Sequence, residues 1–196
     1  AFFVFNKQMG GDIVERVLKY FRGILGCDGW GTYKVFSDNR GILLQRCWAH
    51  LLREVKRTCK GVKDLDNAYV WICDMFDEIQ KLRKIKSQKI RQRGYDRLIV
   101  EMDRWTQIYY ARDGMKELVN KVKNGKEFWF TCVLHPKVEP TNNSAERGLR
   151  KYVVIKKIIG CLRSEQGKRN MQVMLSVLQT WRLQGLNPYK ELRNVV

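Results

Sequence analysis

The sequence predicts an α/β protein that is interrupted by a large helical segment. Residues 1–5 and 23–27 are short apolar runs of the kind that form buried strands, and a helical pattern lies between them. From about residue 60 to residue 126 proline is absent, and apolar residues recur at three- and four-residue steps. Apolar residues make up 44% of the 196 residues, which is enough for a well-formed core.

The first elements are expected to form a strand–helix–strand unit. Asp12 and Glu15 stand three residues apart, as in a capping box that starts a helix. The strand over residues 23–27 stops at the turn-forming pair of Asp28 and a glycine. Because a βαβ unit pairs its strands in parallel, Asp28 would lie at the carboxyl end of a strand, where α/β sheets place ligand groups.

A further short strand is expected over residues 41–45, and a helix over residues 47–57. The segment over residues 60–126 is then predicted to be a hairpin of two or three helices. It includes a basic run, residues 81–97, which holds eight Lys or Arg residues against one acid.

The C-terminal part is predicted to be helical with one extended interruption. A helix starts near Thr141 after a proline-marked loop, and residues 152–155 and 158–161 look like an extended segment or hairpin. A core stripe over residues 171–181 predicts another helix. A short terminal helix is expected at Pro188, because proline is favoured in a first helical turn.

The charge of the chain indicates a polyanionic partner. Lys and Arg number 38 against 20 acids, which gives a formal net charge of +18. Nucleic acid is the usual partner for such an excess, and an anionic membrane surface is the competing interpretation. We expect no membrane insertion, because the apolar runs are far shorter than the ~20 residues that a spanning helix needs.

The six cysteines are scattered and form no CxxC pair, which predicts reduced thiols in a cytoplasmic protein. The sequence begins with a strand-like run and has no initiator Met, so we expect a further N-terminal part to precede it. The cysteines are Cys27, Cys47, Cys59, Cys73, Cys132 and Cys161.

Two carboxylates are candidates for a metal site. Asp28 ends a strand, and Glu146 lies in the first turn of a predicted helix 118 residues later. A helix beside a sheet can bring such residues together, and acids that hold Mg²⁺ are what phosphoryl transfer on DNA requires. From spacing alone, the same residues also fit a turn Asp and a surface Glu favoured by the helix dipole.

Cys47 and His50 have a CxxH spacing. A zinc site would need two more ligands, for which Cys132 and His135 are the candidates. His50 also fits a half-buried histidine that is hydrogen-bonded to the backbone.

Residues 147–169 hold eight basic residues against the single acid Glu165. This density beside Glu146 favours contacts with DNA phosphates, which position DNA without reading its sequence, over a merely solvated face. The basic residues are Arg147, Arg150, Lys151, Lys156, Lys157, Arg163, Lys168 and Arg169.

Several strings of the sequence resemble transposases of the insertion-sequence IS66 type. Residues 142–150 (NNSAERGLR), 163–167 (RSEQG) and 183–189 (LQGLNPY) are similar to the C-terminal signature of that family. Residues 27–33 (CDGWGTY) resemble the segment around its second catalytic Asp, and residues 45–53 (QRCWAHLLR) resemble the segment after it. The strings occur in family order and span nearly the whole chain.

The resemblance implies a ribonuclease H-like mixed sheet, present here in part, with a large helical insertion. Residues 1–60 would be the first part of that core, residues 61–130 the insertion, and residues 131–196 the C-terminal part with the catalytic Glu helix. It also implies a DDE triad in which Asp28 and Glu146 are the second and third acids and hold Mg²⁺ or Mn²⁺. His50 would lie near the active centre and orient a carboxylate or a DNA phosphate.

The implied function is metal-dependent DNA cleavage and strand transfer of an insertion sequence. The implied partners are double-stranded DNA, as transposon ends and target, and further copies of the protein, in the nucleoid-associated cytoplasm. No residue here matches the family's first Asp, which we expect upstream, so the chain alone should be inactive. The alternative is a non-catalytic DNA-binding relic or a repurposed transposase. A third class, an RNA-binding module, lacks the aromatic-rich strand signature.

Overall fold

The computed structural model describes residue 4 and residues 11–29, 31–62, 65–160, 162 and 164–195. The chain forms two compact units. One is Val14–Asn142, and the other combines Ala1–Ile13 with Asn143–Val196. Within the described ranges, none of the helices has the length and apolar character needed to cross a bilayer. The division into core, insertion and C-terminal part stays a prediction.

The sheet is a parallel pair of short strands. β1 (Ile24–Cys27) follows α1 (Gly11–Leu18), and α2 (Gly31–Arg40) connects β1 to β2 (Leu43–Arg46). The predicted α/β class and the strand before Asp28 are confirmed, and the next strand lies two residues later than expected. The strand expected over residues 1–5 lies, apart from Val4, outside the described residues.

α2 was not predicted from the sequence. Its sequence, GTYKVFSDNR, is rich in Gly, β-branched and short polar residues, which have low helix propensity. Its two buried residues, Phe36 and Ser37, are adjacent and therefore give no helical stripe. Two consecutive strands can pair in parallel only through a crossover connection, and α2 is the helix of that connection.

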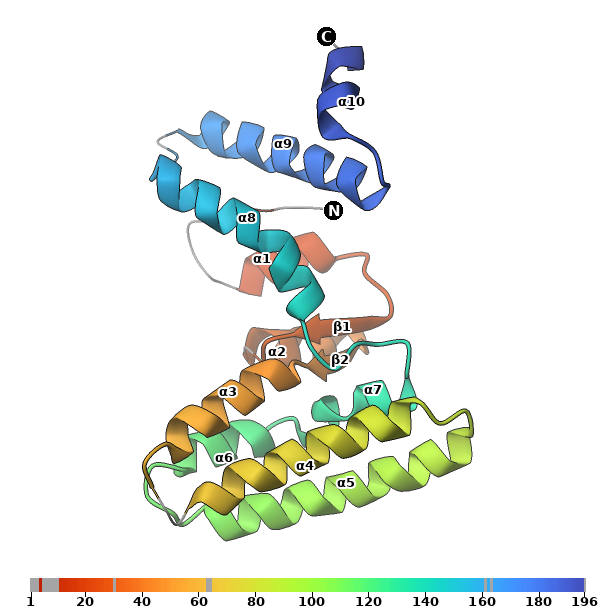
Figure 1. Cartoon of the computed structure of the whole chain (residues 1–196), viewed down its shortest axis with the longest axis vertical. Coiled ribbons are helices and arrows are strands. Elements are labelled where there is room, and N and C mark those ends of the chain that lie inside the picture. The colour runs from red at the N-terminus through yellow and green to blue at the C-terminus, as the bar shows by residue number, and fades with distance from the viewer. Residues whose placement is uncertain are drawn as a thin grey trace. The chain divides into compact units, whose positions relative to one another are not determined.

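The helical segment predicted after residue 60 is confirmed. α3 (Trp48–Cys59) leads into α4 (Asp66–Arg83) and α5 (Gln88–Tyr109), which lie side by side and antiparallel (Figure 1). The short elements α6 (Lys116–Lys123), η2 (Lys126–Trp129) and α7 (Thr131–Leu134) pack against α5 and return the chain to β2.

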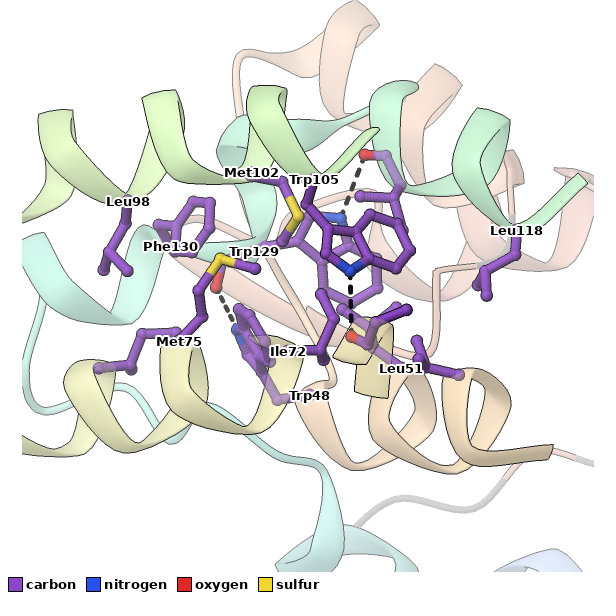
Figure 2. Close-up of a cluster of buried hydrophobic side chains, with 14 of the residues drawn as sticks. Trp48, Leu51, Ile72, Met75, Leu98, Met102, Trp105, Leu118, Trp129 and Phe130 are labelled. Atoms are coloured by element: carbon purple, nitrogen blue, oxygen red, sulfur yellow. Dashed lines mark hydrogen bonds between the residues drawn. The ribbon is translucent and has the colours of Figure 1, made fainter. Parts of the chain in front are cut away.

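The core of this unit combines aliphatic side chains with several buried aromatic ones (Figure 2). The indole N–H of Trp48 donates to the carbonyl of Trp129 at 2.5 Å, and that of Trp105 donates to Ala68 at 3.0 Å. Trp129 in turn donates to the carbonyl of Val122 at 3.3 Å. Each buried indole therefore keeps a hydrogen bond while its ring is removed from water. These bonds join α3 to Trp129 and α5 to α4.

Gly94 of α5 packs directly against Leu82 of α4. A Cβ atom at this position would lie 2.5 Å from Cδ2 of Leu82, which is buried. In Gly94→Ala, the gain of about 1 kcal/mol in helix propensity should be outweighed by an overpacking cost of about 1–3 kcal/mol. We therefore expect a lower free energy of unfolding in urea. Gly148→Ala is the matched control: a helical Cβ there would have its nearest neighbour at 3.9 Å, so that variant should be neutral or slightly more stable.

The second unit consists mainly of α8 (Asn143–Ile159), α9 (Glu165–Leu183) and α10 (Pro188–Val195). Figure 1 shows α8 and α9 as an antiparallel pair. Tyr152 and Leu175 are buried between them, and the Tyr152 hydroxyl donates to Oε1 of Gln179 at 3.0 Å. The helices predicted over residues 171–181 and from Pro188 are confirmed.

The extended segment predicted over residues 152–155 and 158–161 is wrong, because α8 continues to Ile159. Its β-branched residues gave the strand signal. Tyr152 and Ile155, three residues apart, instead belong to one apolar cluster with Met171 and Leu175 of α9. This packing outweighs the local propensity of the segment.

Candidate functional site

Asp28 lies at the carboxyl edge of the sheet, as predicted. It follows Cys27, the last residue of β1, which is in register with Arg46, the last residue of β2. The N–H of Cys47 donates to the carbonyl of Cys27 at 2.8 Å, so the contact between the strands continues to their very end. Asp28 is exposed directly beyond this point, where a ligand can reach its carboxylate.

Arg46 is a fixed cation beside Gly29, the residue that follows Asp28: a Cβ atom on Gly29 would lie 3.9 Å from Nε of Arg46. Its guanidinium donates to the carbonyls of Lys121 at 2.8 Å and Asn124 at 3.0 Å, and it lies 5.3 Å from the ring centroid of Trp129. Burial lowers the pKa of Arg46 from an ordinary value far above neutrality, and nearby acidic groups oppose that shift. Arg46 therefore contributes a positive charge whose position is set by backbone carbonyls.

Cys27 is not suited to act as a nucleophile. Burial raises the pKa of its thiol, and this effect outweighs the hydrogen bond from Gly29 and the charge of Arg46, which lower the pKa. The thiolate is the reactive form of cysteine, so near neutral pH Cys27 is an inert neighbour of Asp28.

Gly125 allows Arg46 to occupy this position. Its φ is +140°, and a Cβ atom there would lie 2.8 Å from Nη2 of Arg46. Gly125→Ala should lower the free energy of unfolding by about 2–4 kcal/mol, because backbone strain is added to a collision with a buried side chain. Urea denaturation measures the loss. Gly61→Ala is the control, because Gly61 has φ +81° and open space around it. An equal loss in both variants would mean that Arg46 does not constrain Gly125.

The loop before α8 is fastened to the same edge of the sheet. The N–H of Trp48 donates to the carbonyl of Pro140 at 2.9 Å, and the N–H of Asn142 donates to Sγ of Cys47 at 3.2 Å. The side-chain oxygen of Asn142 lies so close to Gly26 that a Cβ atom on Gly26 would approach it to 2.9 Å. The residue that precedes α8 thus packs on the strand that precedes Asp28.

Glu146 lies in the first turn of α8, as predicted. It belongs to the second unit, whereas Asp28 belongs to the first, and the pairing of these two carboxylates stays a prediction.

The predicted basic cluster follows Glu146 along the chain. Arg147, Arg150, Lys157 and Arg169 are exposed, whereas Lys168 forms an ion pair with Glu165 at 2.8 Å. The side chains of Lys151, Lys156 and Arg163 lie outside the described part of the chain.

The CxxH pair starts α3. Cys47 is buried, His50 is half-buried, and their ligand atoms lie within 4.8 Å of each other. In the described ranges neither Cys132 nor His135 joins a candidate metal group. Burial raises the pKa of Cys132 to about 12, and the thiolate that zinc binds would therefore be disfavoured. The structure does not support the four-residue zinc site considered from the sequence.

Sequence reasoning missed Arg46 and Asn142. Both lie within the strings quoted above, residues 45–53 and 142–150. Arg46 contacts Lys121, 75 residues away, and Asn142 contacts Gly26, more than 100 residues away. No local pattern in the sequence indicates contacts over such separations.

The comparisons with known proteins agree with the strings in the sequence. A family described as "Transposase IS66 family" matches residues 1–170. The uncharacterized proteins y4qI and y4jD of Sinorhizobium fredii (strain NBRC 101917 / NGR234) are each 23% identical to the chain, over 200 and 210 residues. These matches cover 94% and 99% of this chain but 37% and 41% of the relatives, so the chain spans about two fifths of their length. No solved structure matches the chain significantly.

Proposed function

The chain belongs to the IS66 family of transposases, and from that premise we propose that it carries two of the three carboxylates that catalyse DNA strand cleavage and strand transfer. In this proposal Asp28 and Glu146 are the second and third acids of a DDE triad on a ribonuclease H-like core. Residues 1–60 and 131–196 contribute to that core, and residues 61–130 form a helical insertion.

The packing of Asn142 on Gly26 carries this proposal. Gly26 precedes Asp28 by two residues, and Asn142 precedes Glu146 by four. Residues 143–146 are helical, so Glu146 follows Asn142 by about one helical turn of chain. The residue that packs on the strand before Asp28 is thus a close neighbour of Glu146 in the sequence, and this supports the assignment of the two acids to one site.

The donor set fits Mg²⁺ or Mn²⁺. Both candidate ligands are carboxylates, which are hard oxygen donors, and the neighbouring thiol of Cys27 is kept protonated by burial. When bound, such ions activate the attacking water or 3′-hydroxyl and neutralise charge on the leaving oxygen. Asp28 and Glu146 would hold the ions, and His50 would orient a carboxylate or a DNA phosphate.

Double-stranded DNA is the partner in this proposal, as transposon ends and as target. The formal net charge of +18 and the exposed cations of α8 and α9 favour binding to the phosphate backbone. The protein would act as a homo-oligomer that joins two DNA ends. It would lie in the cytoplasm, associated with the nucleoid.

The test is an assay with the complete protein and duplex DNA that carries the element's terminal repeats. We expect cleavage in Mg²⁺ or Mn²⁺ and none in EDTA. Tight binding of the same DNA without cleavage in either metal would instead support the alternative, a non-catalytic DNA-binding protein derived from a transposase.

A further inference from the structure

One face of α3 is charged along its length, and the opposite face is buried. Trp48, Leu51 and Val55 point into the core. Positions 50, 53, 54 and 57 recur at intervals of three and four residues, and they therefore lie on one side of the helix. The residues on this side are His50, Arg53, Glu54 and Arg57.

This charged face forms one wall of a hollow of about 380 Å³, to which α6 adds Lys121. We call this hollow the α3–α6 groove; it is lined by His50, Arg53, Glu54, Arg57 and Lys121. Nζ of Lys121 lies 2.6 Å from Oε2 of Glu54, so these two opposite charges offset each other. The two arginines then give the groove a net positive charge.

The groove adjoins Asp28 through Lys121. The side chain of Lys121 passes beside Gly29, because a Cβ atom on Gly29 would lie 3.8 Å from Cε of Lys121. The carbonyl of the same lysine accepts the hydrogen bond from Arg46. The groove and the candidate catalytic acid are therefore neighbours within one compact unit.

We propose that the α3–α6 groove binds two nearby phosphates of one DNA strand and leads that strand to Asp28; this inference rests on the proposed function. Guanidinium groups bind phosphate oxygens through paired hydrogen bonds. Arg53 and Arg57 are separated by four residues, or about 6 Å along the helix axis. A strand of duplex DNA carries one phosphate per about 3.4 Å of its axis, so the two arginines match phosphates that are about two nucleotides apart.

The residues of the α3–α6 groove and the basic cluster of residues 147–169 belong to different units of the chain. The groove supplies no sequence-specific contact in this proposal, because phosphates are the same at every base pair.

The test compares two charge-matched double variants of the whole chain. Arg53→Gln with Arg57→Gln removes both groove arginines. Lys56→Gln with Lys60→Gln removes two exposed charges of the same helical segment that do not line the groove. Lys56 lies instead over the ring of Tyr69, at 5.8 Å from its centroid.

Binding to a random-sequence DNA duplex is measured by fluorescence anisotropy across a salt series without divalent metal. Each lost phosphate contact should reduce the slope of log K against log salt by about 0.9. We expect the slope of the groove variant to fall by about two, and its affinity to fall for every duplex sequence. The slope and affinity of the lysine variant should change by less than half as much. Thermal unfolding should be unchanged in both variants, because all four side chains are exposed.

Equal losses in the two variants, or an unchanged slope in the groove variant, would overturn the inference. A preference of the wild-type chain for structured RNA over duplex DNA, lost in the groove variant, would overturn it as well. The measurement needs no catalysis, so its outcome is independent of whether Asp28 and Glu146 support strand transfer.

Discussion

Asp28→Asn in the complete transposase is expected to reduce strand transfer more than about 100-fold and to leave DNA binding intact. Asparagine keeps the shape of the side chain but removes the negative charge that holds a divalent ion. Loss of a residue that only hydrogen-bonds a metal ligand already lowers metal affinity or activity by about 10–100-fold, so loss of a direct ligand should lower activity further. The measurement is joined product formed from terminal-repeat DNA in Mg²⁺.

The same result is expected for Glu146→Gln, because the two carboxylates would share the ions. Asp38→Asn is the matched control: Asp38 is exposed in α2 of the same unit, and its carboxylate pairs with Lys34 at 2.9 Å. This control should retain transfer. If Asp28→Asn and Glu146→Gln also retained it, the assignment of these two acids would fail.

Trp48→Ala is expected to produce the largest loss of stability. The side chain of Trp48 is 0% exposed, and its ring lies 5.7 Å from that of Phe76 and 6.0 Å from that of Trp129, measured between centroids. Truncation would leave a large cavity among these rings and remove a buried hydrogen bond. Such substitutions cost about 3–5 kcal/mol, which is a large part of the stability of a domain of this size. Urea unfolding followed by circular dichroism measures the loss.

Trp48→Phe separates the two contributions to this loss. It keeps an aromatic ring in place and removes the indole N–H that donates to the carbonyl of Trp129. That carbonyl also accepts from Nε2 of Gln45 at 3.2 Å, so it keeps one partner. We expect the loss to be less than half of that in Trp48→Ala. A loss below about 1 kcal/mol in the alanine variant itself would contradict the role of Trp48 in the core.

The strand before Asp28 and most of the helices could be predicted from the sequence. Each of them is marked by a local signal, such as the apolar run over residues 23–27 or the stripe of apolar residues that continues through α9. The position of Asp28 at a strand end followed from the same local signal and the turn-forming pair after it. Together with the quoted strings, this placed both candidate acids in elements of the correct type.

Secondary structure was predicted wrongly from the sequence where local preference and tertiary packing disagree. The β-branched residues of α8 favour a strand when taken alone, and only the contacts of Tyr152 and Ile155 with α9 favour a helix. In α2 the helical stripe is missing, and the helix follows from the need to connect two parallel strands.

The surroundings of Asp28 were decided by the tertiary structure. Arg46 is held by the carbonyls of Lys121 and Asn124, and Asn142 packs on Gly26. These contacts depend on how the helical segment closes back onto the sheet, which is a property of the folded chain and not of any stretch of residues. The sequence by itself therefore determined which acids are candidates for catalysis. The tertiary structure determined that Arg46, the α3–α6 groove and the loop with Asn142 lie around the end of β1. Contacts between residues so far apart in the chain form only when the core between them has packed.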